Sequence, residues 1–68
     1  MAESVKNYVY RLRQGARLTQ EQLADAVGVT RQTIIAIERG NYTPSVLLAL
    51  KLARVFKQSV DNVFSYEK

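Results

Sequence analysis

The side chains best suited to molecular recognition lie in the stretch TRQTIIAIERG, at residues 30–40. Ile34 and Ile37 stand at helical spacing, which predicts a helix with one buried face. The opposite face then carries one amide, two guanidinium groups and several methyl groups, from Gln32, Arg31, Arg39, Thr33, Ile35 and Ala36. Glutamine can form two hydrogen bonds with adenine, arginine can form two with guanine, and methyl groups can contact thymine. These six residues are therefore predicted DNA base contacts.

The alternative for this stretch is an ordinary solvent-facing helix surface. Such a surface usually carries glutamate and lysine, whereas this face has no acid. Base reading therefore accounts better for Gln32, Arg31 and Arg39. Ile35 keeps two interpretations, contact with a thymine methyl group or packing against the following loop.

Catalytic chemistry has little support in the sequence. It contains no histidine and no cysteine, its acids are scattered, and it has no glycine-rich phosphate loop. These absences remove the usual general bases, nucleophiles and zinc ligands. We therefore expect a protein that is not an enzyme, with no metal site, no cofactor and no small-molecule ligand.

Net charge and chain length limit the kinds of partner that the protein is expected to bind. Ten basic and six acidic residues give a net charge of +4, which favours a polyanion and most simply nucleic acid. No apolar run approaches the roughly 20 residues of a membrane span, and the N-terminal sequence lacks a signal peptide. We expect a cytoplasmic protein, associated with the nucleoid when bound to DNA and without a membrane partner. Its 68 residues fit one small domain that needs good packing or a partner subunit.

Capping patterns and helical spacing predict the first three helices. The first spans about 7–14, with Val5, Tyr8, Val9 and Leu12 on one stripe. Thr19 opens the second with Gln22 three residues later, a capping-box pattern, and Gly28 is a plausible left-handed stop. Only Val29 separates that glycine from Thr30, the cap of the third helix, so the two helices should cross steeply.

The C-terminal half predicts two further helices and so an all-α, five-helix fold. Ser45 should cap a fourth helix over 46–57, with an inward face of Val46, Ala49, Leu50, Ala53 and Phe56. Ser59 should cap a short last helix over 60–64. The tail FSYEK has an alternative, since it could pair as a brief strand with residues 3–6.

Taken together, these motifs resemble the Cro/CI-type (Xre) helix-turn-helix regulators. The resemblance is carried by LRQGARLTQEQLA (12–24), VGVTRQTI (27–34), IERG (37–40), YTPS (42–45) and VDNVF (60–64). It defines a DNA-binding domain over 5–64, with the helix-turn-helix motif at about 19–39 and a short tail at 65–68. It implies a compact lambda-repressor-like fold from a prokaryote, with the third helix in the DNA major groove.

The resemblance also implies contacts with the DNA backbone and one internal ion pair. Gln20 matches a glutamine that binds a phosphate and braces the reading helix. Weaker phosphate candidates are Thr19, Asn41, Tyr42 and Thr43. The family pairs the residues that match Arg13 and Glu38, so we expect a partly buried ion pair here, with Arg13 also available to a phosphate.

A homodimer on a pseudo-palindromic operator, acting as a repressor, is the expected mode of action. The fourth helix has more apolar groups than one core needs, and surplus apolar groups indicate self-association. The interface candidates are Leu47, Val60, Val63, Phe64 and Tyr66, of which Phe64 is also a core candidate. Two other functions use the same fold, an antitoxin-type autoregulator and a protein-interaction module.

Overall fold

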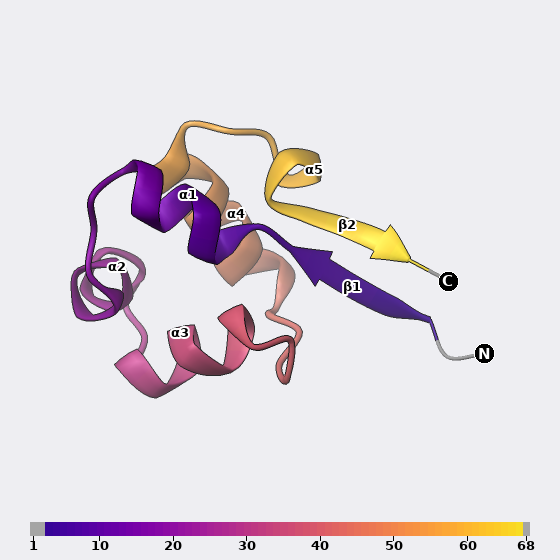
Figure 1. The fold of residues 1–68 in the computed structure, drawn as a ribbon, viewed down its shortest axis with the longest axis horizontal. Coiled ribbons are helices and arrows are strands. Elements are labelled where there is room, and N and C mark those ends of the chain that lie inside the picture. Colours follow the sequence, from indigo (N-terminus) through magenta and orange to yellow (C-terminus); the bar gives the residue numbers. More distant parts are fainter. Residues whose placement is uncertain (1–2, 68) are drawn as a thin grey trace.

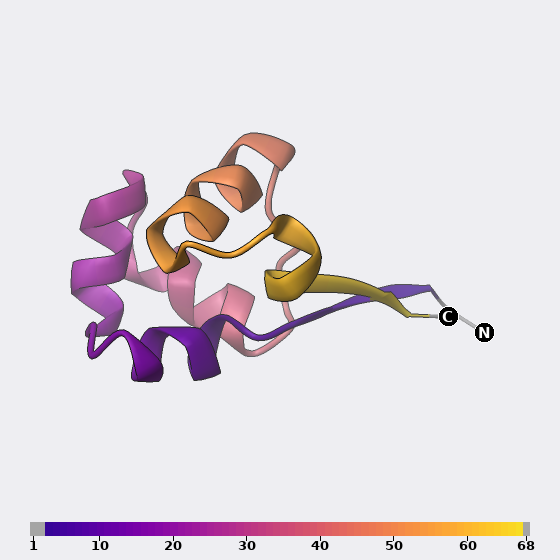
Figure 2. The same cartoon turned by 90° about the horizontal axis from the view of Figure 1, so that it is seen from above.

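The computed structural model describes residues 3–67, which form five helices and a two-stranded sheet. The elements in chain order are β1 (Ser4–Asn7), α1 (Val9–Gly15), α2 (Gln20–Val27), α3 (Arg31–Glu38), α4 (Val46–Phe56), α5 (Val60–Val63) and β2 (Phe64–Glu67). The helices gather in one bundle and the two strands project from its side as a ribbon (Figures 1 and 2). The predicted five-helix fold with a short terminal β-pairing is confirmed.

The ribbon joins the two ends of the described chain. β1 and β2 are antiparallel, with Val5 opposite Tyr66 and Asn7 opposite Phe64. The first helix therefore begins at Val9, and the prediction that it starts near residue 7 with Val5 on its stripe was wrong. Val5 has helical spacing to the later apolar residues, but pairing with residues about 60 positions away satisfies its backbone instead.

Asn7 connects the ribbon to the bundle. Its side-chain oxygen accepts a hydrogen bond from the backbone N–H of Val9 at 3.1 Å, which satisfies a free amide at the start of α1. Its amide nitrogen donates to the backbone carbonyl of Ile37 at 2.8 Å. One side chain thus ties the entry of α1 to the last turn of α3.

The helix-turn-helix connection has the predicted caps. The Thr19 hydroxyl accepts from the backbone N–H of Gln22, and the Gln22 side chain accepts from the backbone N–H of Thr19. Gly28 ends α2 at φ +74°, in the left-handed region that favours glycine. Thr30 then caps α3. In Figure 1, α2 is seen nearly end-on while α3 runs across the view, so the two helices cross steeply as expected.

Side chains from α1–α5 fill the core between the helices. The largest fully buried ones are Leu23, Ile34, Ile37, Leu52, Val9 and Val63. The inward face of α4 was partly mispredicted, because Val46 and Leu50 lie exposed while Leu48 and Leu52 point inward. α4 is apolar on nearly every side, so helical spacing left its orientation open. Contacts with α1, α2 and α5 decide it.

The segment after α4 also departs from expectation. α5 is a single turn that ends at Val63, and the Ser59 side chain makes no capping hydrogen bond. The carbonyl of Val63 accepts from the backbone N–H of Tyr8 at 2.8 Å, and the chain continues directly into β2. Val63 is fully buried and Phe64 is 9% exposed. Both belong to the core, so their prediction as dimer-interface residues is corrected.

Candidate nucleic-acid interface

The outer face of α3 presents the predicted base-contact side chains together. Arg31, Gln32 and Arg39 are exposed, whereas Thr33, Ile35 and Ala36 are half-buried. Ile34 and Ile37 lie on the opposite side of the helix and are fully buried in the core. This division leaves two guanidinium groups and one amide free on a helix that is anchored from behind.

A hydrogen-bonded network holds the C-terminal end of α3. Arg13 donates from Nε to Glu38 Oε2 at 2.6 Å and from Nη2 to Glu38 Oε1 at 3.2 Å. Its Nη1 donates to the carbonyl of Leu18 at 2.9 Å. The amide nitrogen of Gln20 donates to Glu38 Oε1 at 3.1 Å. The network therefore links α1, the start of α2 and the end of α3, and fixes their mutual orientation.

The Arg13–Glu38 ion pair is buried, so it restricts the relative positions of α1 and α3 more than a surface ion pair would. The side chains of Arg13 and Glu38 are 9% and 6% exposed. The hydrogen bond to Glu38 raises the pKa of Arg13, against the lowering effect of burial. Arg13 therefore stays charged, and the negative charge of Glu38 is balanced inside the protein rather than presented to DNA.

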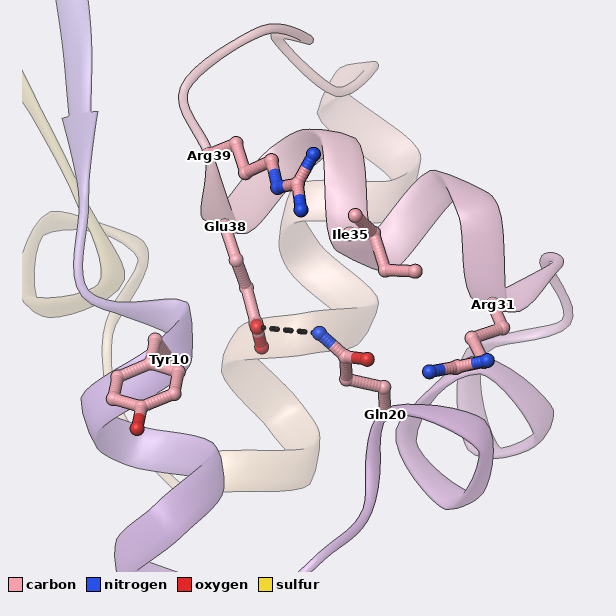
Figure 3. Close-up of a pocket in the computed structure, with 6 residues that line it drawn as sticks. All are labelled: Tyr10, Gln20, Arg31, Ile35, Glu38 and Arg39. Atoms are coloured by element: carbon pink, nitrogen blue, oxygen red, sulfur yellow. Dashed lines mark hydrogen bonds between the residues drawn. The ribbon is translucent and has the colours of Figure 1, made fainter.

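A recess of about 310 Å³ opens between α1, α2 and α3 (Figure 3). Its lining consists of Tyr10, Gln20, Arg31, Ile35, Glu38 and Arg39. Figure 3 shows Gln20 and Glu38 joined by their hydrogen bond in the middle, with Arg31 and Arg39 toward the two ends of α3. Because Glu38 is already paired with Arg13, the two free guanidinium groups leave the recess electropositive.

The predicted phosphate contacts fall into two groups. Thr19 and Gln20 stand at the start of α2, where they line a second depression together with Arg13, Glu21 and Arg31. Asn41, Tyr42 and Thr43 form the exposed loop that follows α3. In the sequence, one group therefore precedes α3 and the other follows it.

Arg13 also lines the second depression, but it is much less accessible than the other phosphate candidates. It is 7% exposed, and all three of its side-chain nitrogens donate to protein acceptors. The ring of Tyr10 lies over its guanidinium at 5.3 Å from the ring centroid. Its surroundings favour a scaffold role, and they give little support to the expected phosphate contact.

Sequence reasoning missed Tyr10 and Asn7 as members of this region. Tyr10 lies three residues before Arg13 on α1, a spacing that places two side chains on the same helix face. That spacing could have identified it. Asn7 carried no comparable signal, because its partner Ile37 lies 30 residues away in sequence.

The surplus apolar groups lie mainly on the first half of α4. Val46, Leu47 and Leu50 are 77%, 63% and 53% exposed, and we call these three residues the α4 apolar surface. Of the other expected interface residues, Tyr66 is 63% exposed and Val60 is half-buried. The exposed apolar groups therefore include the expected Leu47, but they lie mainly on α4 rather than on α5 and β2, where most of the interface was expected.

Across 3–67, no helix is long and apolar enough to cross a membrane. Within the same part of the chain, no three His, Cys, Asp or Glu side chains are grouped so that they could hold a metal ion.

Comparison with known proteins gives consistent matches. A helix-turn-helix family model matches residues 9–62. The HTH-type transcriptional regulator YgzD of Bacillus subtilis strain 168 is 48% identical over 64 residues, covering 94% of this chain and 97% of YgzD. An HTH-type transcriptional regulator of Methanocaldococcus jannaschii is 49% identical over 63 residues, which cover 93% of this chain and 96% of that regulator.

A solved structure agrees with these sequence matches. The restriction-modification controller protein C.AhdI from Aeromonas hydrophila superposes with a TM-score of 0.74 at 31% identity. The match covers 79% of this chain and 82% of that protein. The bundle that carries the α3 face is therefore shared with a restriction-modification controller protein.

Proposed function

Because the chain belongs to the Cro/CI-type (Xre) family of helix-turn-helix transcriptional regulators, which bind DNA, we propose that it is a repressor that binds a pseudo-palindromic operator as a homodimer. The observation that carries this proposal is the α3 outer face. It offers Arg31, Gln32 and Arg39 to a ligand while the apolar side of the helix is fully buried.

The α3 face is suited to read base edges in the major groove. Gln32 pairs with adenine N6 and N7, and Arg31 with guanine O6 and N7, each through two hydrogen bonds. Arg39, at the end of the helix, contacts either a base or a phosphate. The half-buried methyl groups of Thr33, Ile35 and Ala36 face thymine methyl groups.

Backbone contacts fix the register of α3 in the groove. The amide of Gln20 has two N–H groups, of which Glu38 takes one, so the other is available to a phosphate oxygen. The Thr19 hydroxyl accepts its capping bond and still has its own proton to donate. Asn41, Tyr42 and Thr43 contact the backbone on the other side of α3. Such contacts position the protein without reading sequence.

Two-fold symmetry supplies the remaining specificity. One domain of this size reads only a few base pairs, too few to select a site among roughly 10⁶ or more competing positions. A symmetric dimer doubles the contacts and places its two reading helices about 34 Å apart, one turn of DNA. A protein bound to an operator that overlaps a promoter blocks the binding of RNA polymerase. DNA binding by itself would then repress transcription.

The α4 apolar surface supports a second copy of the chain as partner. Residues 45–50 read SVLLAL and carry no charge, so two copies can meet there without repulsion. The following half of the helix carries Lys51 and Arg54, which would repel their counterparts. Val60 and Tyr66 lie on the next two elements and are candidates for the rim of this contact.

A protein-docking role fits the same fold less well. A docking helix would present an acidic or apolar outer face, whereas α3 presents an amide and two guanidinium groups. The likeness to a restriction-modification controller protein supports a regulator of this fold instead.

Selection of bound sites from a pool of random duplexes tests the proposal. We expect inverted repeats whose half-site centres lie about 10 base pairs apart. Enrichment of a single unrepeated motif would contradict the dimer, and no enrichment would contradict sequence-specific binding.

A further inference from the structure

Tyr10 is an exposed aromatic side chain that the functions assigned above leave unused. It is 56% exposed on α1 and lines the same recess as Arg31, Ile35 and Arg39. The other large exposed apolar residues lie on the α4 apolar surface, on the ribbon or in the loop after α3. Tyr10 is therefore the one such residue of the described chain that stands at the recess.

Tyr10 lies over the buried side chain of Arg13. The side-chain nitrogens of Arg13 donate hydrogen bonds to Glu38 and to the carbonyl of Leu18, and Arg13 is almost fully buried. The Tyr10 ring lies over the guanidinium with its centroid 5.3 Å from Cζ. A cation at this distance attracts the face of the ring and favours this orientation. The outermost group on the α1 edge of the recess is thus a phenol, while the charge lies beneath it.

The recess connects Tyr10 with the reading helix. In Figure 3, Tyr10 occupies the α1 side of the recess, and Arg31, Ile35 and Arg39 occupy the α3 side. If α3 enters the major groove, the DNA strand that borders the groove passes along the α1 edge. We propose that the Tyr10 hydroxyl donates a hydrogen bond to a phosphate oxygen of that strand, an inference that rests on the proposed docking of the α3 outer face.

The chemistry of this contact differs from that of the arginines. A phenol is a neutral donor near pH 7, so its bond to a phosphate releases no counterion. The contact also reads no base, and it therefore contributes equally to preferred and random sequences. Its stiff ring, held by Arg13, loses little rotamer freedom on binding. Tyr10 thus sets how α1 rests on the backbone and helps to hold α3 in register.

Tyr10→Phe isolates the hydroxyl, because the ring and its contact with Arg13 are kept. We expect affinity to fall about tenfold per half-site, on the selected operator and on random duplex alike. The slope of log affinity against log salt should stay unchanged, because the hydroxyl is uncharged and its loss removes no neutralised phosphate. Tyr8→Phe is the matched control, since its ring also lies near two cations, Lys6 and Arg11, yet it lines no part of the recess.

Single methylphosphonate substitutions in the operator backbone locate the contact. In the wild type, one position per half-site should weaken binding through loss of the Tyr10 bond, and in Tyr10→Phe that position should lose its effect. Unchanged affinity of Tyr10→Phe, or the same methylphosphonate profile for both proteins, overturns the inference. If Gln32→Ala still loses operator preference in that case, the proposed function stands and only the role of Tyr10 fails. If the wild type binds no duplex, both fail.

Discussion

At the scale of single residues, we expect the proposed base contacts on α3 and the proposed phosphate contacts to make separable contributions to affinity. Gln32 is exposed on α3 and is proposed to contact a base edge. Gln20 is half-buried, is held by Glu38 and is proposed to contact a phosphate. The two residues have the same side chain, so they form a matched pair for testing specificity against general affinity.

Gln32→Ala should weaken binding mainly at the preferred operator, by about 1–3 kcal/mol, because a bidentate contact with adenine is lost. Gln20→Ala should weaken preferred and random duplexes together, because a phosphate contact carries no sequence information. Titration of both duplexes with both variants measures this. Equal losses on the two duplexes for Gln32→Ala would remove Gln32 from the base contacts.

At the scale of elements, buried polar links set the relative positions of α1, α2 and α3. Glu38 accepts hydrogen bonds from Arg13 and Gln20 and is nearly inaccessible to solvent. Such a network fixes geometry, and it is costly when one member is removed because the remaining charge stays buried.

Glu38→Ala should lower the free energy of unfolding by roughly 3–5 kcal/mol, since Arg13 would keep a buried charge without its partner. Thermal or denaturant unfolding without DNA measures the change. Asp25→Ala serves as the control, because Asp25 is an exposed acid on α2 and its loss should alter stability little. A Glu38→Ala midpoint equal to that of the wild type would show that the ion pair contributes nothing.

The turn between α2 and α3 allows a second test at this scale. Gly28 has φ +74° with no atom near the position that a Cβ would occupy, so Gly28→Ala adds backbone strain without a clash. We expect a loss of about 1–2 kcal/mol in unfolding free energy. Gly15 is equally open but lacks a positive φ, so Gly15→Ala should be neutral or slightly stabilising. A Gly28→Ala variant as stable as Gly15→Ala would contradict this account of the turn.

Elements with strong local signals were predictable from the sequence. The capping box at Thr19, the left-handed Gly28 and the cap at Thr30 act within a few residues, and all three were found as expected. The start of α1 was not, because β1 depends on pairing with a distant strand. The orientation of α4 was missed because its apolar groups surround the helix, so only its neighbours select the buried side.

The candidate site shows the same division between local and distant information. Side chains on the outer face of α3 could be selected by helical spacing alone, since Ile34 and Ile37 define the buried side. The three-residue spacing could place Tyr10 beside Arg13 on α1, but it gave no link from Tyr10 to the α3 face. It meets Arg31 and Arg39 only through the recess that folding creates between α1 and α3.

At the scale of the whole molecule, the proposed homodimer would double the base contacts and so increase selectivity for the operator. Leu47→Glu places a charge on the α4 apolar surface, where Leu47 is exposed and its replacement leaves the core intact. We expect monomers in sedimentation at concentrations where the wild type is dimeric, with retained thermal stability of the fold. Ala26→Glu introduces the same charge at an exposed position on α2 and should leave the dimer unchanged.

The most direct test of the central claim compares the selected operator with the same duplex after one half-site has been scrambled. We predict that the wild type binds the intact operator as two chains per duplex, and far more tightly than the scrambled one. Leu47→Glu should abolish that advantage, because it prevents the dimer from forming. A wild-type chain that stays monomeric at high micromolar concentration and binds both duplexes equally tightly would contradict a symmetric dimer that reads two half-sites.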